Sequence, residues 1–227
     1  MPLFAIPFPV IDPVAIAIGP FAIRWYALAY IAGIVLGWRY ALWLVSRPPR
    51  FMSRAAMDDF IVWCTLGIIL GGRLGYVLFY KPGYYLFQPW EALFLWRGGM
   101  SFHGGLIGVL TAIALFARRH SLPGLALGDV VATVTPIGLF TGRIANFING
   151  ELVGRVSDVP WAMVFPGAGP SPRHPSQLYQ AGLEGLALFV ILWLYSRSAR
   201  PRGAISGVFL IGYGSFRFIA EFFRTPD

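Results

Sequence analysis

The sequence predicts an all-α polytopic membrane protein, and three observations support this fold class. First, the 227 residues are 57% hydrophobic and 12% charged, whereas roughly 25% of the residues of soluble domains are charged. Second, several apolar stretches reach the length of about 20 residues that a helix needs to cross a bilayer core. Third, a few ionisable residues fall inside these stretches, where they are costly and usually functional.

Six apolar stretches predict membrane-spanning helices. They are residues 21–45, 57–80, 99–118, 125–146, 175–196 and 204–223. A further run, 84–96, is apolar and aromatic, but it is preceded or interrupted by Pro82, Gly83 and Pro89. We therefore expect residues 81–98 to form an interfacial or re-entrant arm.

Glycine recurs at four-residue spacing within several of these stretches. The pairs are Gly33 and Gly37, Gly67 and Gly71, Gly71 and Gly75, and Gly104 and Gly108. Small residues at this spacing allow helix backbones to approach closely in lipid. We interpret these glycines as packing positions rather than as functional ones.

The basic residues predict the orientation of the chain, because cytoplasmic loops are enriched in Lys and Arg. The arginines expected on the cytoplasmic side are Arg47, Arg50, Arg54, Arg118, Arg119, Arg197, Arg200 and Arg202. The N-terminus then faces outward, and so does the C-terminus after six crossings. The long connection 147–174, rich in Gly and Pro, becomes an outward-facing head inserted in a single membrane domain over residues 1–227.

Charge and motif content exclude several functions. The formal net charge is +8, but the arginines are scattered and no nucleic-acid motif is present, so we expect anionic lipid rather than nucleic acid as the partner. The sequence has no Walker loop, no metal-spaced cluster of His, Cys and Glu, and no GxSxG nucleophile elbow. No metal or nucleotide cofactor is therefore expected.

The first candidate functional motif is RGGMSFHGGLIG, residues 97–108. Its His103 is flanked by glycine pairs at 98–99 and 104–105, which have no side chains and so leave the backbone around the imidazole uncovered. Three interpretations remain open: the side chain is structural, acts as a general base, or donates a hydrogen bond to a phosphate. A metal site is not expected, because no second His or Cys lies nearby.

The second motif is GRIANFINGEL, residues 142–152. Arg143 and Asn146 are three residues apart and therefore share a helix face, and Asn149-Gly150 predicts a turn. An arginine and amides at a helix end suit a phosphate oxygen. The alternative is an arginine that extends to the outer membrane interface.

The third motif is YGSFRFIAEFFR, residues 213–224, in which Tyr213, Arg217 and Glu221 recur every four residues. This spacing places them along one helix face. The alternative to a functional role is an internal Arg217–Glu221 ion pair that allows both residues to enter the membrane. Such a pair still presents a guanidinium group to a cavity.

Other ionisable residues fall within the predicted helices. Arg24 and Arg39 lie near the ends of a long stretch and are expected to extend to the interface. Asp129 is expected to be an anion at the N-terminus of its own helix. Glu184 is interpreted as the partner of an arginine, and Arg73 is a further functional candidate.

These motifs, with HPSQLYQAGLEG at 174–185 and GGRLGYVLFY at 71–80, closely resemble the bacterial prolipoprotein diacylglyceryl transferase family. The resemblance implies transfer of the sn-1,2-diacylglyceryl group from phosphatidylglycerol to the lipobox cysteine thiol of preprolipoproteins. A thioether forms and glycerol phosphate leaves, at the outer face of the bacterial cytoplasmic membrane. Members of the family have seven membrane helices, so we expect the last one to be missing from this chain.

The resemblance also implies functional residues. The implied catalytic residues are His103, Arg143 and Arg217. The implied substrate-binding residues are Tyr26, Gly98, Gly99, Gly104, Gly105, Asn146, Glu151, Tyr213 and Glu221. We expect the two arginines to hold the phosphate and Glu221 to orient Arg217. His103 either removes the thiol proton or binds the lipid head group.

Three other functions compete if the resemblance is set aside. Arginines within the membrane suit an anion transporter or channel, but we find no inverted repeat of broken segments. A non-catalytic lipid-binding or scaffold protein is the second alternative. An intramembrane protease would need a Ser–His or paired Asp site. Apart from Asp58 and Asp59 at the very start of the 57–80 stretch, Asp129 is the single Asp within the predicted helices.

Overall fold

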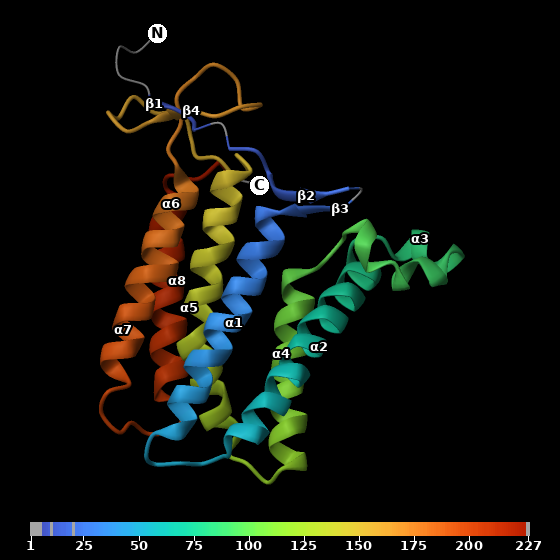
Figure 1. The fold of residues 1–227 in the computed structure, drawn as a ribbon, viewed down its shortest axis with the longest axis vertical. Coiled ribbons are helices and arrows are strands. Elements are labelled where there is room, and N and C mark those ends of the chain that lie inside the picture. The colour runs from blue at the N-terminus through green and yellow to red at the C-terminus, as the bar shows by residue number, and fades with distance from the viewer. Residues whose placement is uncertain (1–5, 10, 20, 226–227) are drawn as a thin grey trace. The chain divides into compact units, whose positions relative to one another are not determined.

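The computed structural model describes residues 6–9, 11–19 and 21–225. Both ends of the predicted domain 1–227 therefore lie outside the described residues. Most of the described chain is helical (Figure 1). It forms two compact units, called here the first and second units. The first comprises Met1–Tyr40 and Asp129–Asp227, and the second comprises Ala41–Gly128.

The first unit is a bundle of apolar helices. They are α1 (Trp25–Ser46, as far as Tyr40), α5 (Gly124–Ile148, from Asp129), α6 (Ser176–Gln180), the π-helix η3 (Ala181–Ala187), α7 (Leu188–Tyr195) and α8 (Ala204–Glu221). The continuous rod of α6, η3 and α7 packs along α8 (Figure 1). Glycines permit close approach of α1 and α5, since a Cβ added at Gly33 on α1 would lie 3.3 Å from the Cα of Gly138 on α5.

The first predicted helix begins four residues later than expected. Phe21–Arg24 form strand β3, which pairs antiparallel with β2 (Val14–Ile18), and α1 begins at Trp25. A short apolar run suits a strand as well as a helix, and here pairing with β2 decides the outcome. The other predicted stretches coincide with helices to within three residues at each end.

The connection 147–174 is folded around a small apolar core. Strand β4 (Met163–Val164) pairs in parallel with β1 (Ile6–Pro7). The ring of Phe8 packs against Phe147 and Phe165 at centroid distances of 5.2 and 5.0 Å. These contacts pack the long connection against the C-terminal end of α5.

Asp129 lies in the second turn of α5 and accepts hydrogen bonds from the first turn of α8. The prediction that it stabilises the N-terminus of its own helix was wrong. The carboxylate does stabilise a helix N-terminus, but the helix is one that follows about 75 residues later. Only tertiary packing brings that helix beside it.

The second unit is built on α2 (Arg54–Phe79) and α4 (Phe102–Arg119), which run antiparallel in close contact (Figure 1). Glycines form the contact: a Cβ added at Gly71 would lie 2.3 Å from the Gly104 carbonyl oxygen, and one at Gly67 would lie 2.6 Å from the Gly108 oxygen. The packing role predicted for these glycines is confirmed.

The segment between α2 and α4 consists of α3 (Pro82–Phe87) and two 3-10 helices, η1 (Pro89–Leu93) and η2 (Leu95–Arg97). Pro82 and Pro89 each begin a helix, where a missing N–H costs nothing. Large apolar side chains remain exposed on this segment, among them Leu86, Phe87, Leu93 and Trp96.

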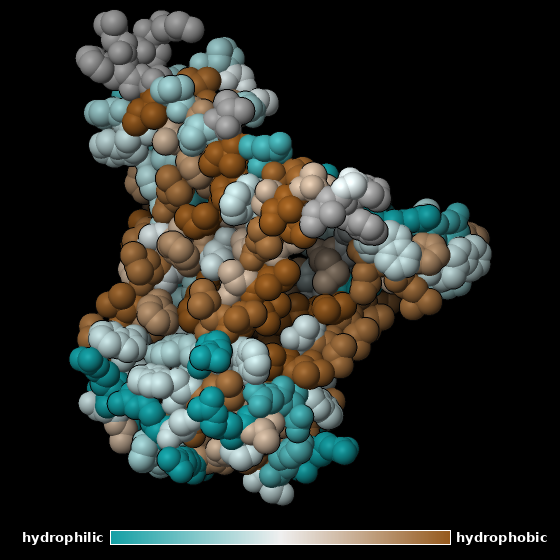
Figure 2. Space-filling view, in the orientation of Figure 1, coloured by the Kyte–Doolittle hydropathy of each residue, from teal (hydrophilic) through white to brown (hydrophobic). Residues whose placement is uncertain are grey.

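Within the part of the chain that the structure describes, four helices are long and apolar enough to cross a membrane: Trp25–Ser46, Arg54–Phe79, Gly124–Ile148 and Ser176–Tyr195. Helices α4 and α8, of 18 residues each, are not among them. Figure 2 shows apolar surface over the helices and hydrophilic side chains gathered toward the helix ends. Because so much exposed apolar surface requires lipid around it, the chain is a membrane protein.

Candidate functional site

A chain of polar side chains follows the C-terminal end of α5. Arg143 Nη1 donates to Asn146 Oδ1 at 3.3 Å, and Asn146 Nδ2 donates to Glu151 Oε2 at 3.3 Å. Asn149 Nδ2 donates to the other oxygen of Glu151 at 3.2 Å. The predicted turn is confirmed: Gly150 has a φ of 67°, a left-handed conformation that glycine adopts readily. This turn folds Glu151 back toward the helix end.

A second row of polar side chains lies along α8. Arg217 Nη2 lies 2.9 Å from Glu221 Oε2, so the predicted i,i+4 ion pair is confirmed. Arg224 Nη1 lies 3.7 Å from the same carboxylate oxygen. On its other side, Arg217 Nη1 lies 4.0 Å from Oε1 of Glu184, which projects from η3.

The two rows share one electrostatic environment. The charges of Glu184, Arg217 and Arg224 all act on the Arg143 guanidinium, as does the Tyr213 hydroxyl. The interpretation of Glu184 as the partner of an arginine is confirmed by its 4.0 Å ion pair with Arg217, and the charges of Arg143 and Arg224 also act on it.

Tyr26 joins this site through a second tyrosine. Its hydroxyl lies 3.3 Å from that of Tyr30, and Tyr30 in turn interacts electrostatically with Arg143. The first unit therefore brings together seven of the predicted site residues. They are Tyr26, Arg143, Asn146, Glu151, Tyr213, Arg217 and Glu221.

The other predicted site residues belong to the second unit. His103 lies in the first turn of α4, where its exposed imidazole packs edge-on against Phe102 at a centroid distance of 5.7 Å. Gly104 is a packing residue, since an added Cβ would lie 2.2 Å from the Gly71 carbonyl oxygen. Gly105 is less constrained, with Ile68 O at 3.7 Å from its added Cβ.

Gly98 and Gly99 are fixed by Arg73, which the sequence marks as a functional candidate without indicating its role. Both glycines have positive φ values, of 75° and 84°. The buried Arg73 guanidinium donates hydrogen bonds to five backbone carbonyls. The acceptors are the carbonyls of Glu91, Ala92, Phe94, Gly98 and Gly99. One helix side chain therefore holds the backbone that leads to His103.

Arg224 is a further residue that sequence reasoning missed. It is 6% exposed, and its backbone carbonyl accepts a hydrogen bond from Arg155 Nε at 2.9 Å. The residue thus ties the end of α8 to the 147–174 connection. Its position three residues after Glu221 and seven after Arg217 matches the periodicity of one helix face and is the signal that could have identified it.

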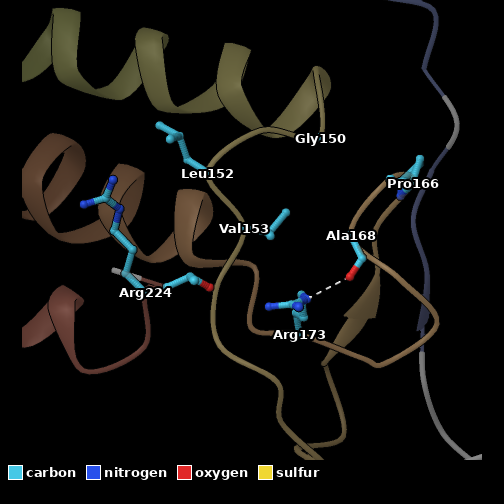
Figure 3. A pocket seen from close by; sticks show the side chains of 9 residues that line it. Gly150, Leu152, Val153, Pro166, Ala168, Arg173 and Arg224 are labelled. Atoms are coloured by element: carbon cyan, nitrogen blue, oxygen red, sulfur yellow. Dashed lines mark hydrogen bonds between the residues drawn. The ribbon is translucent and has the colours of Figure 1, made fainter. Parts of the chain in front are cut away.

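A pocket of about 560 Å³ lies beside this end of α8 (Figure 3). Its lining residues are Gly150, Leu152, Val153, Pro166, Gly167, Ala168, Arg173, Arg224 and Thr225. Arg173 donates to the Ala168 carbonyl at 3.2 Å and to the Gly154 carbonyl at 3.1 Å. Gly150 and Leu152 flank Glu151, so the pocket borders the chain segment that carries this carboxylate.

His174 ends the 147–174 connection beside α6 and the residues that follow α8. Its Nδ1 shares a hydrogen bond of 3.0 Å with the Tyr179 hydroxyl, and its ring packs edge-on against Phe223. Partial burial lowers the pKa of His174 from its usual value, because the imidazolium loses hydration.

Acidic, His and Cys side chains do not form a metal centre within residues 6–9, 11–19 and 21–225: no group of three or more is placed to hold an ion there. The chemistry of the first-unit cluster is instead that of anion binding. Guanidinium groups held by carboxylates and amides form directed, charge-assisted hydrogen bonds with phosphate oxygens.

Known proteins match this chain over nearly its full length. A family model described as prolipoprotein diacylglyceryl transferase matches residues 13–227. A phosphatidylglycerol–prolipoprotein diacylglyceryl transferase of Paramagnetospirillum magneticum is 60% identical over 99% of this chain and 85% of the relative. Proteins of the same name from Rhodopseudomonas palustris and Rhodospirillum rubrum are both 62% identical, over 100% and 99% of this chain and 82% and 84% of the relatives. The chain belongs to the prolipoprotein diacylglyceryl transferase family.

Proposed function

We propose that this protein transfers the sn-1,2-diacylglyceryl group of phosphatidylglycerol to the lipobox cysteine thiol of preprolipoproteins. The transferase forms a thioether and releases glycerol phosphate, a step of bacterial lipoprotein biogenesis. The observation that carries this proposal is the cluster of Arg143 and Arg217 with carboxylates and amides between apolar helices. Such a cluster suits a lipid whose phosphate enters from the membrane.

The two arginines bind the phosphate of phosphatidylglycerol. Arg143 is braced by Asn146 and, through it, by Glu151, while Arg217 is oriented by Glu221. Negative charge grows on the phosphate as the glyceryl carbon–oxygen bond breaks. Preorganised guanidinium donors therefore stabilise the transition state more than the ground state. Tyr26 and Tyr213 line the same binding site.

The attacking sulfur must first lose its proton, since a free cysteine thiol has a pKa of about 8.5. His103 is exposed at the first turn of α4 and is the proposed base. A neutral imidazole accepts the thiol proton, and the thiolate displaces the phosphate oxygen from the glyceryl carbon. In the alternative role, His103 donates a hydrogen bond to the lipid head group. Gly98 and Gly105 leave the backbone beside it open to substrate, while Gly99 and Gly104 pack against α2.

The proposed setting is the bacterial cytoplasmic (inner) membrane. In this topology all six long helical stretches cross the bilayer and the N-terminus is periplasmic. Residues 81–98 form an interfacial arm and 147–174 a periplasmic head, both within one membrane domain. The active site opens toward the periplasmic leaflet, where both the lipid and the preprolipoprotein signal peptide are present.

The test is transfer in a purified system. The full chain is incubated with phosphatidylglycerol vesicles and a synthetic lipobox peptide, and the peptide mass is measured. A gain of one diacylglyceryl group is expected, whereas a peptide with Ser in place of the lipobox Cys gains nothing. Phosphatidylcholine vesicles are the lipid control. If the Cys peptide gains no mass, the protein is not this transferase and the anion-transporter alternative is favoured.

A further inference from the structure

The carboxylate of Glu184 is buried within the first unit and takes no direct part in the proposed transfer. Its side chain is 0% exposed. Among the residues that the structure describes, no donor hydrogen-bonds either carboxylate oxygen. A buried carboxylate that has lost its hydration without gaining donors is costly, so its presence requires a compensating interaction.

The compensating interaction is with Arg217. This guanidinium lies between an exposed and a buried carboxylate. Glu221, at 2.9 Å, has a side chain that is 43% exposed, whereas Glu184, at 4.0 Å, has one that is 0% exposed. Arg217 itself is 30% exposed. A substrate anion can therefore reach it from the Glu221 side but not from the Glu184 side.

The backbone around Glu184 is unusual and keeps this residue in place. Glu184 lies in the middle of the π-helix Ala181–Ala187, and π-helical turns inside longer helices are frequent at functional sites. The next residue, Gly185, packs directly on α5, since a Cβ added there would lie 2.7 Å from the Phe140 Cβ. This contact presses the Glu184 segment against α5.

Charge balance distinguishes the two carboxylates further. Among the described residues, the hydrogen bonds and ion pairs around Arg143 and Arg217 join three guanidinium groups and three carboxyl groups. They are Arg143, Arg217, Arg224, Glu151, Glu184 and Glu221. A phosphodiester anion entering this balanced cluster adds uncompensated negative charge unless a carboxylate withdraws. Glu221 can withdraw into the exposed region, whereas Glu184 cannot, because it is enclosed by protein.

We propose that Glu184 is a positioning residue, which holds Arg217 from its buried side while the substrate phosphate replaces Glu221 on the exposed side. Glu184 has this role only if the protein is the proposed transferase. The other ionisable groups that act on Glu184 are Arg143 from α5, Tyr213 and Glu221 from α8, and Arg224 after α8. In this arrangement the negative charge of Glu184 matters more than its shape.

The test compares Glu184→Gln, which keeps the shape and loses the charge, with Glu184→Asp, which keeps the charge and loses a methylene. We expect Glu184→Gln to lower kcat at least tenfold without raising the KM for phosphatidylglycerol, and Glu184→Asp to stay within threefold of wild type. A purely structural role predicts the opposite order, because Gln is isosteric and Asp leaves a cavity. Thr133→Val, another buried polar change in the first unit, should leave kcat within threefold.

A second measurement decides the question if Glu184→Gln does not fold well. Each of Glu184→Gln and Arg217→Gln removes one charge, so each should melt at a lower temperature than the double variant, in which both charges are absent. The role of Glu184 is overturned if Glu184→Gln turns over as fast as Glu184→Asp, or if the double variant melts below both single ones. If the wild type itself transfers nothing, the proposed function fails first.

Discussion

Asp129 on α5 forms a cap for α8: its carboxylate accepts hydrogen bonds from the Ser206 N–H and hydroxyl at 2.8 Å and from the Gly203 N–H at 2.7 Å. Gly203 has a φ of 89°, which is strained for residues with a Cβ. The cap fixes the start of the helix whose other end carries Arg217 and Glu221. The Asp129 cap therefore helps to fix the helix that positions two residues of the candidate site.

Asp129→Ala should destabilise the protein by about 1–3 kcal/mol, because the partly buried N–H groups of Gly203 and Ser206 lose a carboxylate acceptor. Thermal unfolding in detergent is the measurement. Asp59→Ala, at an exposed position of α2, is the control and should change the melting temperature much less. Equal melting temperatures for the two variants would show that the cap contributes little.

Gly71→Ala should disrupt the pairing of α2 with α4. The new methyl would lie 2.3 Å from the Gly104 carbonyl oxygen, and forcing the helices apart costs about 1–3 kcal/mol. In Gly37→Ala the methyl meets Val134 at 3.7 Å, an ordinary contact, so this variant should melt close to wild type. A Gly71→Ala protein as stable as Gly37→Ala would contradict the close packing.

Arg143→Lys and Arg217→Lys should each lower kcat/KM at least tenfold. Lysine keeps the charge but cannot form the paired hydrogen bonds of a guanidinium group. Transfer to the lipobox peptide is the assay, and Arg39→Lys, at an exposed position of α1, should behave as wild type. Full activity in either variant would show that the substituted arginine does not bind the phosphate.

His103→Gln and His103→Asn distinguish the two roles of this residue. If the imidazole removes the thiol proton, both variants should lose at least tenfold in kcat, because an amide cannot accept that proton. His120→Gln, at the other end of α4, should stay near wild type. Activity of the His103 variants within threefold of wild type would rule out the base role.

The stability of the 147–174 connection should fall in mild acid. Burial lowers the pKa of His174 in the folded state, so the unfolded chain binds a proton at higher pH than the folded one. Above about pH 6.5, the pKa of His174 in the unfolded chain, this difference costs no stability. As the pH falls from there through the lower pKa of the folded protein, the free energy of unfolding decreases. The melting temperature should therefore drop less between pH 8 and pH 5 in His174→Gln than in wild type. An equal drop in both would exclude His174 as a source of the pH dependence.

Helix locations and the main polar contacts within each motif were predictable from the sequence. Five of the six apolar stretches coincide with helices to within three residues at each end. The Arg217–Glu221 pair and the turn at Gly150 also follow from spacing and residue type. These features depend on residues that are neighbours in the chain, so periodicity and turn chemistry are sufficient to predict them.

The sequence by itself therefore determined a membrane protein with arginines, a histidine and amides in ordered motifs. Only the tertiary structure decided that Arg73 binds the backbone leading to His103, that Asp129 caps α8, and that Glu184 faces Arg217. The physical reason is that hydropathy and helix periodicity are local properties. The partner of a buried charge is set instead by which distant helices pack together, because a charge in apolar surroundings is stable only beside the groups that compensate it.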